Sequence, residues 1–209
     1  MSTAISGWRI ESDAREQTMR KSKQEAARTR ERIVEAAAAE FCEHGLAATG
    51  LAELMSAAGL THGGFYRHFD SKDQLIEEAC AEAIATMMDR LASAASQRSG
   101  RAGLKAATAA YLSTRHRDNP RDGCPLAALG SELVRADPRA RAVATAGFLR
   151  MVDILAGQFD QAGPSEARKR AIAAASTLIG ALTMSRIVND RALSESILRS
   201  AVDSCNATH

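Results

Sequence analysis

The chain has 209 residues, enough for one sizeable core or two modest domains, and its net charge of +2 excludes a uniformly cationic protein. Aromatic residues make up 4% of the sequence, alanine is abundant, and no alternating run of Val, Ile or Thr indicates a strand, so we expect an all-α fold. The longest apolar run, 171–184, is too short to span a bilayer, and the first residues lack the apolar core of a secretory signal.

Residues 1–26 are polar, mixed in charge and without a sustained apolar face, which indicates a flexible basic N-terminal arm. Between Arg15 and Arg32, seven basic residues stand against three acidic ones. Such a run is either an ordinary solvated face or an arm that contacts the DNA backbone, and both interpretations stay open.

A first firm helix is expected from Thr29 to His44, because apolar residues recur every four positions along it. Ile33, Ala37 and Phe41 form this face, and Gly45 directly follows the helix and ends it. We therefore expect the Phe41 side chain to lie in a core.

The next stretch, Thr49 to Lys72, contains two short helices joined by a tight turn. The first has apolar residues at helical spacing, followed by Gly59, which tolerates the left-handed conformation that closes many helices. Those apolar residues are Leu51, Leu54, Met55 and Ala58. Thr61 is placed to cap the second helix, in which Phe65 faces inward. Ser71 with Gln74 then forms a capping box for a third helix.

The outward face of the second helix is polar, basic and lacks carboxylates. It consists of His62, Gly63, Gly64, Tyr66, Arg67 and His68. A helical hairpin in an ordinary core would explain Phe65 but not two glycines that open a helix at roughly 1 kcal/mol each. A helix-turn-helix that brings its backbone close to the major groove of DNA explains both.

The second half of the chain is expected to be helical throughout. A long helix over 72–95 leads to a boundary at 96–103, and a helix over 104–112 is broken at 115–123. Pro125 suits the first position of the next helix, and Pro138 precedes a longer one. The last two helices, 165–188 and 191–205, carry apolar bands that serve either one subunit's core alone or both the core and a partner.

The N-terminal region holds apolar, glycine, aromatic and basic residues in one register: Ile33, Ala36, Ala37, Phe41, Gly45, Leu54, Ala58, Gly59, Leu60, Thr61, Phe65, Tyr66, His68, Phe69, Ser71 and Lys72. On these residues, 27–87 resembles the DNA-binding domain of the TetR family of bacterial transcriptional regulators, with its helix-turn-helix at 50–69. The resemblance implies that 88–209 is a domain for effector binding and dimerisation. Met19 resembles a natural start in this family, which leaves open whether residues 1–18 are translated.

The resemblance also implies roles for individual residues in DNA binding. Thr61, Tyr66, His68 and Lys72 would contact phosphates, whereas the side chains and backbone better placed to meet base edges belong to His62, Gly63, Gly64 and Arg67. Gly50 departs from the family, which usually has Ser or Thr there, and we expect Thr49 to take over that phosphate contact.

For the second half, the resemblance implies a homodimer through the last two helices, a palindromic operator, and a small-molecule effector that releases a repressor from DNA. We expect pocket-facing residues among apolar side chains of this half, each of which is also a candidate for plain core. They are Tyr111, Cys124, Phe148, Met151 and Met184.

Cys124 raises a sharper alternative. It lies at a predicted helix N-terminus beside Arg115, Arg117 and Arg121, where a thiolate is favoured, although Asp118 and Asp122 oppose this. Residues 123–133, GCPLAALGSEL, are similar to a segment of TetR-type electrophile sensors with a modified cysteine. A sensor and a structural cysteine both remain open.

The sequence indicates no enzyme, cofactor or metal. The four cysteines show no CxxC spacing and no His partners, which favours reduced thiols in the cytoplasm. His116 and Cys124 are separated by a loop and are weak evidence for a thiol enzyme. The alternative function is therefore a helical enzyme or ligand carrier whose helix-turn-helix is incidental.

Overall fold

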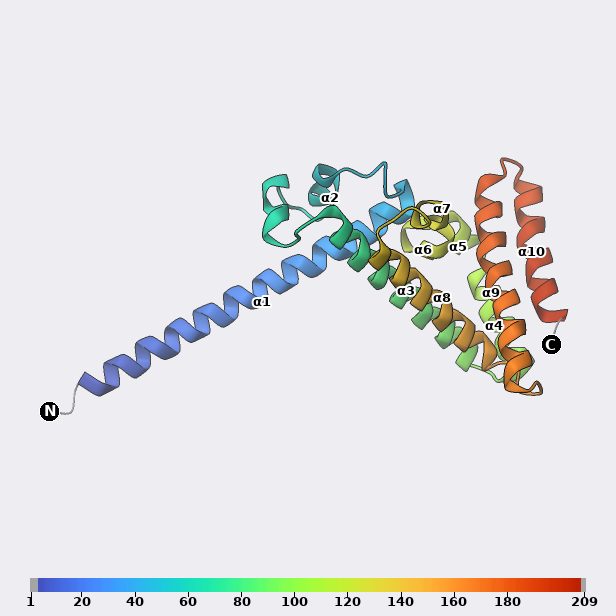
Figure 1. The fold of residues 1–209 in the computed structure, drawn as a ribbon, viewed down its shortest axis with the longest axis horizontal. Helices are drawn as coiled ribbons and strands as arrows, with labels where there is room; N and C mark the ends of the chain where they lie inside the picture. Colours follow the sequence, from blue (N-terminus) through green and yellow to red (C-terminus); the bar gives the residue numbers. More distant parts are fainter. Residues whose placement is uncertain (1–3, 208–209) are drawn as a thin grey trace.

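The computed structural model describes the backbone of residues 4–207 and the side chains of residues 19–207. Within the described residues every regular element is a helix, so the predicted all-α fold is confirmed (Figure 1). The elements are α1 (Ala4–His44), α2 (Leu51–Ala57), the 3₁₀ helix η1 (His62–Arg67), α3 (Lys72–Ser96), α4 (Gly100–Tyr111), α5 (Thr114–Asp118), the 3₁₀ helix η2 (Pro120–Asp122), α6 (Pro125–Ala128), α7 (Gly130–Leu133), α8 (Pro138–Ala156), α9 (Pro164–Ile187) and α10 (Arg191–Ala207).

Helix α1 is much longer than the sequence predicted. It runs for 41 residues from Ala4, so the expected start at Thr29 is wrong. No glycine or proline interrupts the chain between Trp8 and His44, and the helix continues through the polar segment without a breaker. Figure 1 shows this N-terminal half of α1 extending away from the other helices. Residues 1–3 of the predicted arm lie outside the described residues.

The N-terminal half has its own hydrophobic core. Side chains from α1, α2, η1 and the start of α3 meet there, and Phe41 is 1% exposed, as its helical spacing predicted. The other large, fully buried members are Ile33, Leu54, Met55, Phe65, Phe69 and Leu75, together with Leu129 from the junction of α6 and α7. Burial of each such side chain contributes about 1.5–3 kcal/mol, which makes this core the main constraint on the angle of η1.

Helix α3 connects this core to a second one. Its first turns, including Leu75, belong to the N-terminal core, whereas its later residues from Ile84 onward belong to the C-terminal core. Helix α8 packs against α3 at Gly147, where an added Cβ would lie 2.5 Å from Ile84 Cγ2. The two cores therefore share one continuous helix, as the periodicity over 72–95 predicted.

The C-terminal half contains longer helices and shorter interruptions than predicted. Only residues 97–99 separate α3 from α4, and the expected break over 115–123 contains α5 and η2. Pro125 does start a helix, but α6 ends after four residues, at Ala128. Helices α9 and α10 lie side by side in antiparallel directions at the end of the molecule opposite to α1 (Figure 1).

Candidate nucleic-acid interface and effector cavity

The second helix of the helix-turn-helix is a six-residue 3₁₀ helix, η1. Gly59 precedes it with φ +71°, which confirms the left-handed turn, and Thr61 occupies the N-cap position. The Thr61 side chain makes no capping hydrogen bond, so Thr61 occupies the N-cap position without pairing a backbone N–H of η1. Ser71 does cap α3 as predicted, because its Oγ accepts a hydrogen bond from Gln74 N at 3.1 Å.

Aromatic side chains anchor η1 to the core beneath it. The Phe65 and Phe69 rings are stacked with their centroids 5.6 Å apart, and the Tyr66 ring meets Phe65 edge-on. Arg30 of α1 lies over the Phe69 ring, 4.4 Å from its centroid, and its Nε donates to the His68 carbonyl at 3.2 Å.

Arg30 also forms a bidentate ion pair with Glu78 of α3. The hydrogen bond from Arg30 lowers the pKa of the Glu78 carboxyl, so the pair is charged at neutral pH. Arg30 thus ties α1, η1 and α3 together. No sequence pattern indicated this role, because the three segments are distant in the chain.

The outward face of η1 is exposed, as predicted. The Tyr66 side chain is 68% exposed, and His62, Gly63 and Arg67 are exposed as well. Gly64 and His68 are partly buried. An added Cβ at Gly63 would meet no atom within 4 Å, so packing within the described chain does not require a glycine there.

Thr49 does not occupy the place that the sequence predicted for it. It is 2% exposed, and its Oγ1 donates to the Gly45 carbonyl at 2.7 Å. The hydroxyl is therefore engaged inside the protein, and the predicted phosphate contact of Thr49 is wrong. Lys72 is partly buried, and its Nζ donates to the Leu46 carbonyl at 2.7 Å, which leaves two ammonium protons for another acceptor.

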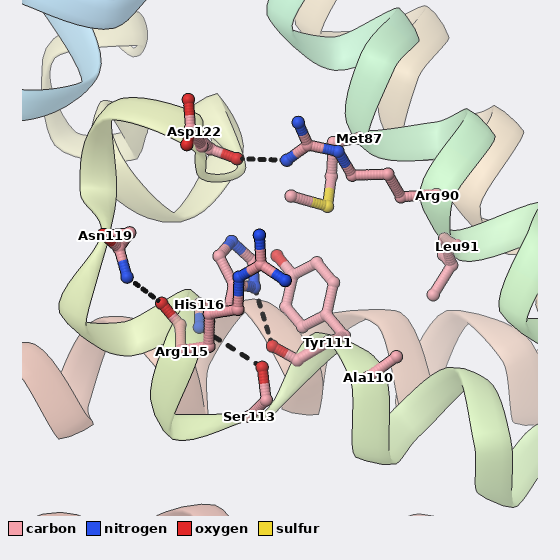
Figure 2. Close-up of a pocket in the computed structure, with 10 residues that line it drawn as sticks. All are labelled: Met87, Arg90, Leu91, Ala110, Tyr111, Ser113, Arg115, His116, Asn119 and Asp122. Atoms are coloured by element: carbon pink, nitrogen blue, oxygen red, sulfur yellow. Dashed lines mark hydrogen bonds between the residues drawn. The ribbon is translucent and has the colours of Figure 1, made fainter.

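A cavity of about 530 Å³ lies between α3, α4, α5 and η2 (Figure 2). Of the five residues predicted for the pocket, Tyr111 lines it. The full lining is Met87, Arg90, Leu91, Ala110, Tyr111, Ser113, Arg115, His116, Asn119 and Asp122. The arginines and Met87 were not predicted as pocket residues, because they converge only in the folded chain.

His116 fixes the inner wall of this cavity. Its Nε2 accepts a hydrogen bond from Cys124 N at 3.0 Å, so the ring proton is on Nδ1, which donates to the Tyr111 carbonyl at 2.7 Å. Burial lowers the pKa of His116 to about 4, so the ring is neutral at pH 7. The ring meets Tyr111 edge-on at 4.9 Å.

Cys124 does not have the environment that the sequence predicted. The side chain is fully buried, and burial raises the pKa of its thiol, against the smaller opposing effects of Tyr111, two backbone amides and Arg186. Desolvation of the thiolate thus outweighs the hydrogen bonds at the start of the four-residue helix and the charge of Arg186. The prediction of a favoured thiolate at Cys124 is wrong for this conformation.

The remaining three predicted pocket residues do not line the cavity. Met151 is fully buried in the C-terminal core, and Phe148 is partly buried against it. Met184 is 47% exposed on α9. Cys124 does not line the cavity either and meets its wall through the backbone N–H that donates to His116, so Tyr111 is the one member of the predicted set that lines it.

An exposed apolar strip follows α9 and the start of α10. Ile172, Met184 and Ile187 on α9 are 42%, 47% and 66% exposed, and Leu193 on α10 is 50% exposed. An added Cβ at Gly180 would meet no atom within 4 Å. The inward face of α9 is fully used in the core through Ala171, Ala175, Leu178 and Leu182.

Two further observations concern metal binding and membrane insertion. No group of three or more His, Cys, Asp or Glu side chains in the described part of the chain is arranged to hold a metal ion. None of the described helices is long and apolar enough to cross a membrane.

Comparison with known families gives two matches that together cover most of the chain. Residues 33–79 match the family described as bacterial regulatory proteins, tetR family. Residues 102–197 match the C-terminal domain described as transcriptional regulator LmrA/YxaF-like.

Curated relatives agree with these matches. An HTH-type transcriptional regulator of Mycobacterium tuberculosis (strain H37Rv) is 31% identical over 172 residues, which cover 77% of this chain and 86% of the relative. The HTH-type transcriptional regulator TtgR of Pseudomonas putida is 40% identical over 76 residues, 36% of each chain. A probable acrEF/envCD operon repressor of Escherichia coli K12 is 41% identical over 59 residues, 28% of this chain and 27% of the repressor, so this match spans about a quarter of that relative.

Solved structures of low sequence identity share the fold. Reduced NemR of E. coli superposes with a TM-score of 0.73 at 20% identity, covering 86% of this chain and 96% of NemR. AibR, in a complex with isovaleryl coenzyme A and operator DNA, superposes with a TM-score of 0.59 at 20% identity, covering 84% of this chain and 97% of AibR.

Proposed function

Because the chain belongs to the TetR family of bacterial transcriptional regulators, we propose that it is a repressor that binds operator DNA and leaves it when an effector binds. The DNA-binding element is α2 with η1, and the effector site is the cavity that Tyr111 lines. Under this proposal the protein acts in the cytoplasm, where bacterial DNA lies. The relatives are regulators, so they do not favour the alternative of an enzyme or ligand carrier.

The observation that carries the DNA-binding proposal is the face of η1. Its buried side is fixed by Phe65 and Phe69, while Gly63, Tyr66 and Arg67 are exposed to solvent. A glycine that no internal contact requires lets the backbone approach an external surface closely. An exposed helix with this small and basic face fits the major groove.

Within this interface we assign two kinds of contact. Thr61, Tyr66, His68 and Lys72 contact phosphates and set the position of the protein on the duplex. His62, Gly63, Gly64 and Arg67 meet base edges, and Arg67 pairs with a guanine for a discrimination of about 1–3 kcal/mol. Arg67 is exposed and has no ion-pair partner within the described chain, which leaves its guanidinium available.

The proposal includes a homodimer through α9 and α10. The apolar strip of Ile172, Met184, Ile187 and Leu193 supports it, because large apolar side chains exposed on two neighbouring helices are typical of an interface. A two-fold dimer places its recognition helices about one DNA turn apart, roughly 34–36 Å, and therefore requires a palindromic operator. The AibR structure, of the same fold, holds operator DNA and a small molecule together.

The test is fluorescence anisotropy of the full chain on DNA upstream of its own gene, with scrambled DNA of equal length as the control. We expect a preference of at least about a thousandfold for the upstream DNA at physiological salt. Equal and steeply salt-dependent binding to both DNAs would contradict a specific regulator of its own promoter.

Two variants separate the assigned contacts. Arg67→Ala should lose affinity for the operator but not for scrambled DNA, because its contact is to a base. Lys72→Ala should lose affinity for both DNAs alike and reduce the salt slope by about one ion. If both variants lose the same factor on both DNAs, the division between base and phosphate contacts is wrong.

A further inference from the structure

The inner end of the cavity holds hydrogen-bonding groups without strong partners. The Tyr111 side chain is 2% exposed, and its Oη makes no hydrogen bond to a nitrogen or oxygen atom of the described chain; the thiol of Cys124, a weak acceptor, lies beside it. Figure 2 shows this hydroxyl end of the ring pointing toward the space enclosed by Met87, Arg90 and Arg115. A buried hydroxyl with only a weak partner is unfavourable, so a ligand atom that accepts its proton in a stronger hydrogen bond gains affinity.

Behind Tyr111, Arg186 of α9 presents a second unpaired group. Its Nε and Nη2 donate to the carbonyls of Arg117 and His116 at 3.1 and 2.7 Å, whereas Nη1 is buried without a partner. Burial lowers the pKa of Arg186, and its charge in turn opposes the rise of the Tyr111 pKa that burial causes. The interior at this end of the cavity is therefore electropositive.

The outer walls add two more guanidinium groups. Arg90 of α3 uses Nη1 to donate to the Asp122 carbonyl at 2.8 Å. Its other guanidinium N–H groups remain available to donate to a ligand. The Arg115 guanidinium projects into the cavity in Figure 2, and only the backbone carbonyl of Arg115 is used, by Asn119.

Few negative charges oppose these arginines. His116 contributes no charge, because its pKa of about 4 keeps the ring neutral. Among the lining residues Asp122 alone is acidic, against two arginines and the Arg186 charge behind Tyr111.

The apolar part of the lining restricts what such a ligand can be. Met87, Leu91 and Ala110 form one side of the cavity. A cavity of about 530 Å³ falls within the range of sites for small organic molecules. A free inorganic anion would leave this apolar wall uncovered.

We propose that the effector is an amphipathic organic anion, with a carboxylate or phenolate between Arg90 and Arg115, a polar atom at Tyr111 Oη, and an apolar body against Met87 and Leu91. This inference rests on the proposed function in taking the cavity as the effector site. Charge-assisted hydrogen bonds to guanidinium groups are the interactions that select an anion over a neutral molecule of equal shape.

The test uses three probes that share one ring system: 2-naphthoate, its neutral amide 2-naphthamide, and the cation 2-naphthylmethylammonium. Binding to the full chain is measured by isothermal titration calorimetry in the absence of DNA. We expect the naphthoate to bind about tenfold or more tightly than the amide, and the ammonium to bind most weakly. Equal affinities, a preference for the amide or ammonium, or no binding of any probe up to about 5 mM would overturn the inference.

Variants locate the preference in this cavity. In Arg90→Gln/Arg115→Gln the preference for naphthoate over the amide should fall below about threefold, and Tyr111→Phe should weaken naphthoate without changing the fold. Arg139→Gln, an exposed arginine on α8 outside the cavity, is the matched control and should keep the full preference. A preference that survives in the double variant would overturn the assignment.

The calorimetric assay and the DNA-binding assay test different claims, so a negative result in one does not decide the other. Loss of the anion preference contradicts the inference and leaves operator binding untouched, since no DNA is present in the calorimeter. Failure to bind any DNA sequence contradicts the proposed function whatever the probes show.

Discussion

The orientation of the outward-facing residues of η1 depends on the residues packed beneath this helix. Phe65 and Phe69 fix the short 3₁₀ helix from below, and Arg30 joins it to α1 and α3. With this support, a helix of six residues that includes two glycines keeps one orientation. At this scale, folding and DNA recognition are carried by different side chains and can be separated by substitution.

Gly63→Ala tests that separation. Because an added Cβ has open space and φ is not positive, we expect the free energy of unfolding to stay equal or to rise by up to about 1 kcal/mol. Operator affinity should fall by about tenfold or more, since the methyl group occupies the position that closely approaches DNA. Urea denaturation and anisotropy measure the two effects. Unchanged operator affinity would contradict the role of Gly63 as a close-approach residue.

His116 makes stability depend on pH. Its pKa is lowered from 6.5 to about 4, so between these pH values the unfolded chain binds the proton more readily than the folded one. The native state is unaffected above pH 6.5 and loses stability as pH falls toward 4, by about 1.4 kcal/mol per pH unit. At pH 5 the loss is about 2 kcal/mol.

His116→Gln should remove this loss. Urea denaturation at pH 7 and pH 5 should show a drop for the wild type that is larger than the drop for His116→Gln by about 2 kcal/mol. The exposed His62→Gln serves as the control and should keep the wild-type drop. An equal drop in all three proteins would contradict the buried neutral ring.

Cys124 shows why single residues are hard to interpret from sequence. Its predicted position at the start of a helix is correct, and the arginine that favours its thiolate is Arg186 rather than the three arginines of the preceding loop. Its complete burial depends on packing from α4 and α9, which are distant in the chain, and this burial decides the pKa. Thr49 has a different explanation, because its Oγ1 donates to the carbonyl of Gly45 four residues earlier, and this local hydrogen bond directs the hydroxyl inward.

At the scale of elements, the C-terminal half packs Leu129, Leu133 and Ala140 into the N-terminal core, and polar contacts join the two halves as well. Arg121 of η2 forms ion pairs with Glu40 and Glu43 of α1. Glu132 of α7 accepts hydrogen bonds from the backbone amides of Leu46 and Ala47, at 3.2 and 2.9 Å, just before α2. η2 also supplies Asp122 to the cavity wall, so the Arg121 ion pairs connect the cavity with α1, which packs beneath the helix-turn-helix.

Glu132→Ala tests the second of these contacts. It leaves two backbone amides without an acceptor, and we expect a loss of about 1–2 kcal/mol in the free energy of unfolding. Amide hydrogen exchange at Leu46 and Ala47 should accelerate, while Ser131→Ala, at the exposed neighbouring position, should leave it unchanged. Unaltered exchange at both amides would show that Glu132 does not hold this segment.

Elements defined by local chemistry were predicted well from the sequence. Pro138 starts α8, Gly163 precedes α9, and α3 ends one residue beyond the prediction. Prolines, glycines and periodic apolar faces act within a few residues, so they are visible in the sequence. The cavity was predicted poorly, with Tyr111 alone of the predicted set lining it, because α3, α4, α5 and η2 create it by tertiary packing.

At the scale of the molecule, the proposed dimer accounts for the apolar strip on α9 and α10. Ile187→Glu places a charge at a residue that is 66% exposed in one subunit, so it should leave the fold intact but prevent association. Sedimentation should show a 22.2 kDa monomer with greatly reduced operator affinity. Val134→Glu, at a residue 68% exposed outside this strip, should remain dimeric. A dimeric Ile187→Glu protein would contradict the assigned interface.

The central claim is that two copies of η1 read a palindromic DNA sequence, and one measurement tests it without assuming any operator sequence. The purified full chain is used to select binding sites from a random DNA library, and the bound DNA is sequenced. The account predicts one enriched motif, an inverted repeat with half-sites centred about one helical turn apart. Enrichment of no motif, or of a single unrepeated site, would contradict a two-fold, sequence-specific repressor.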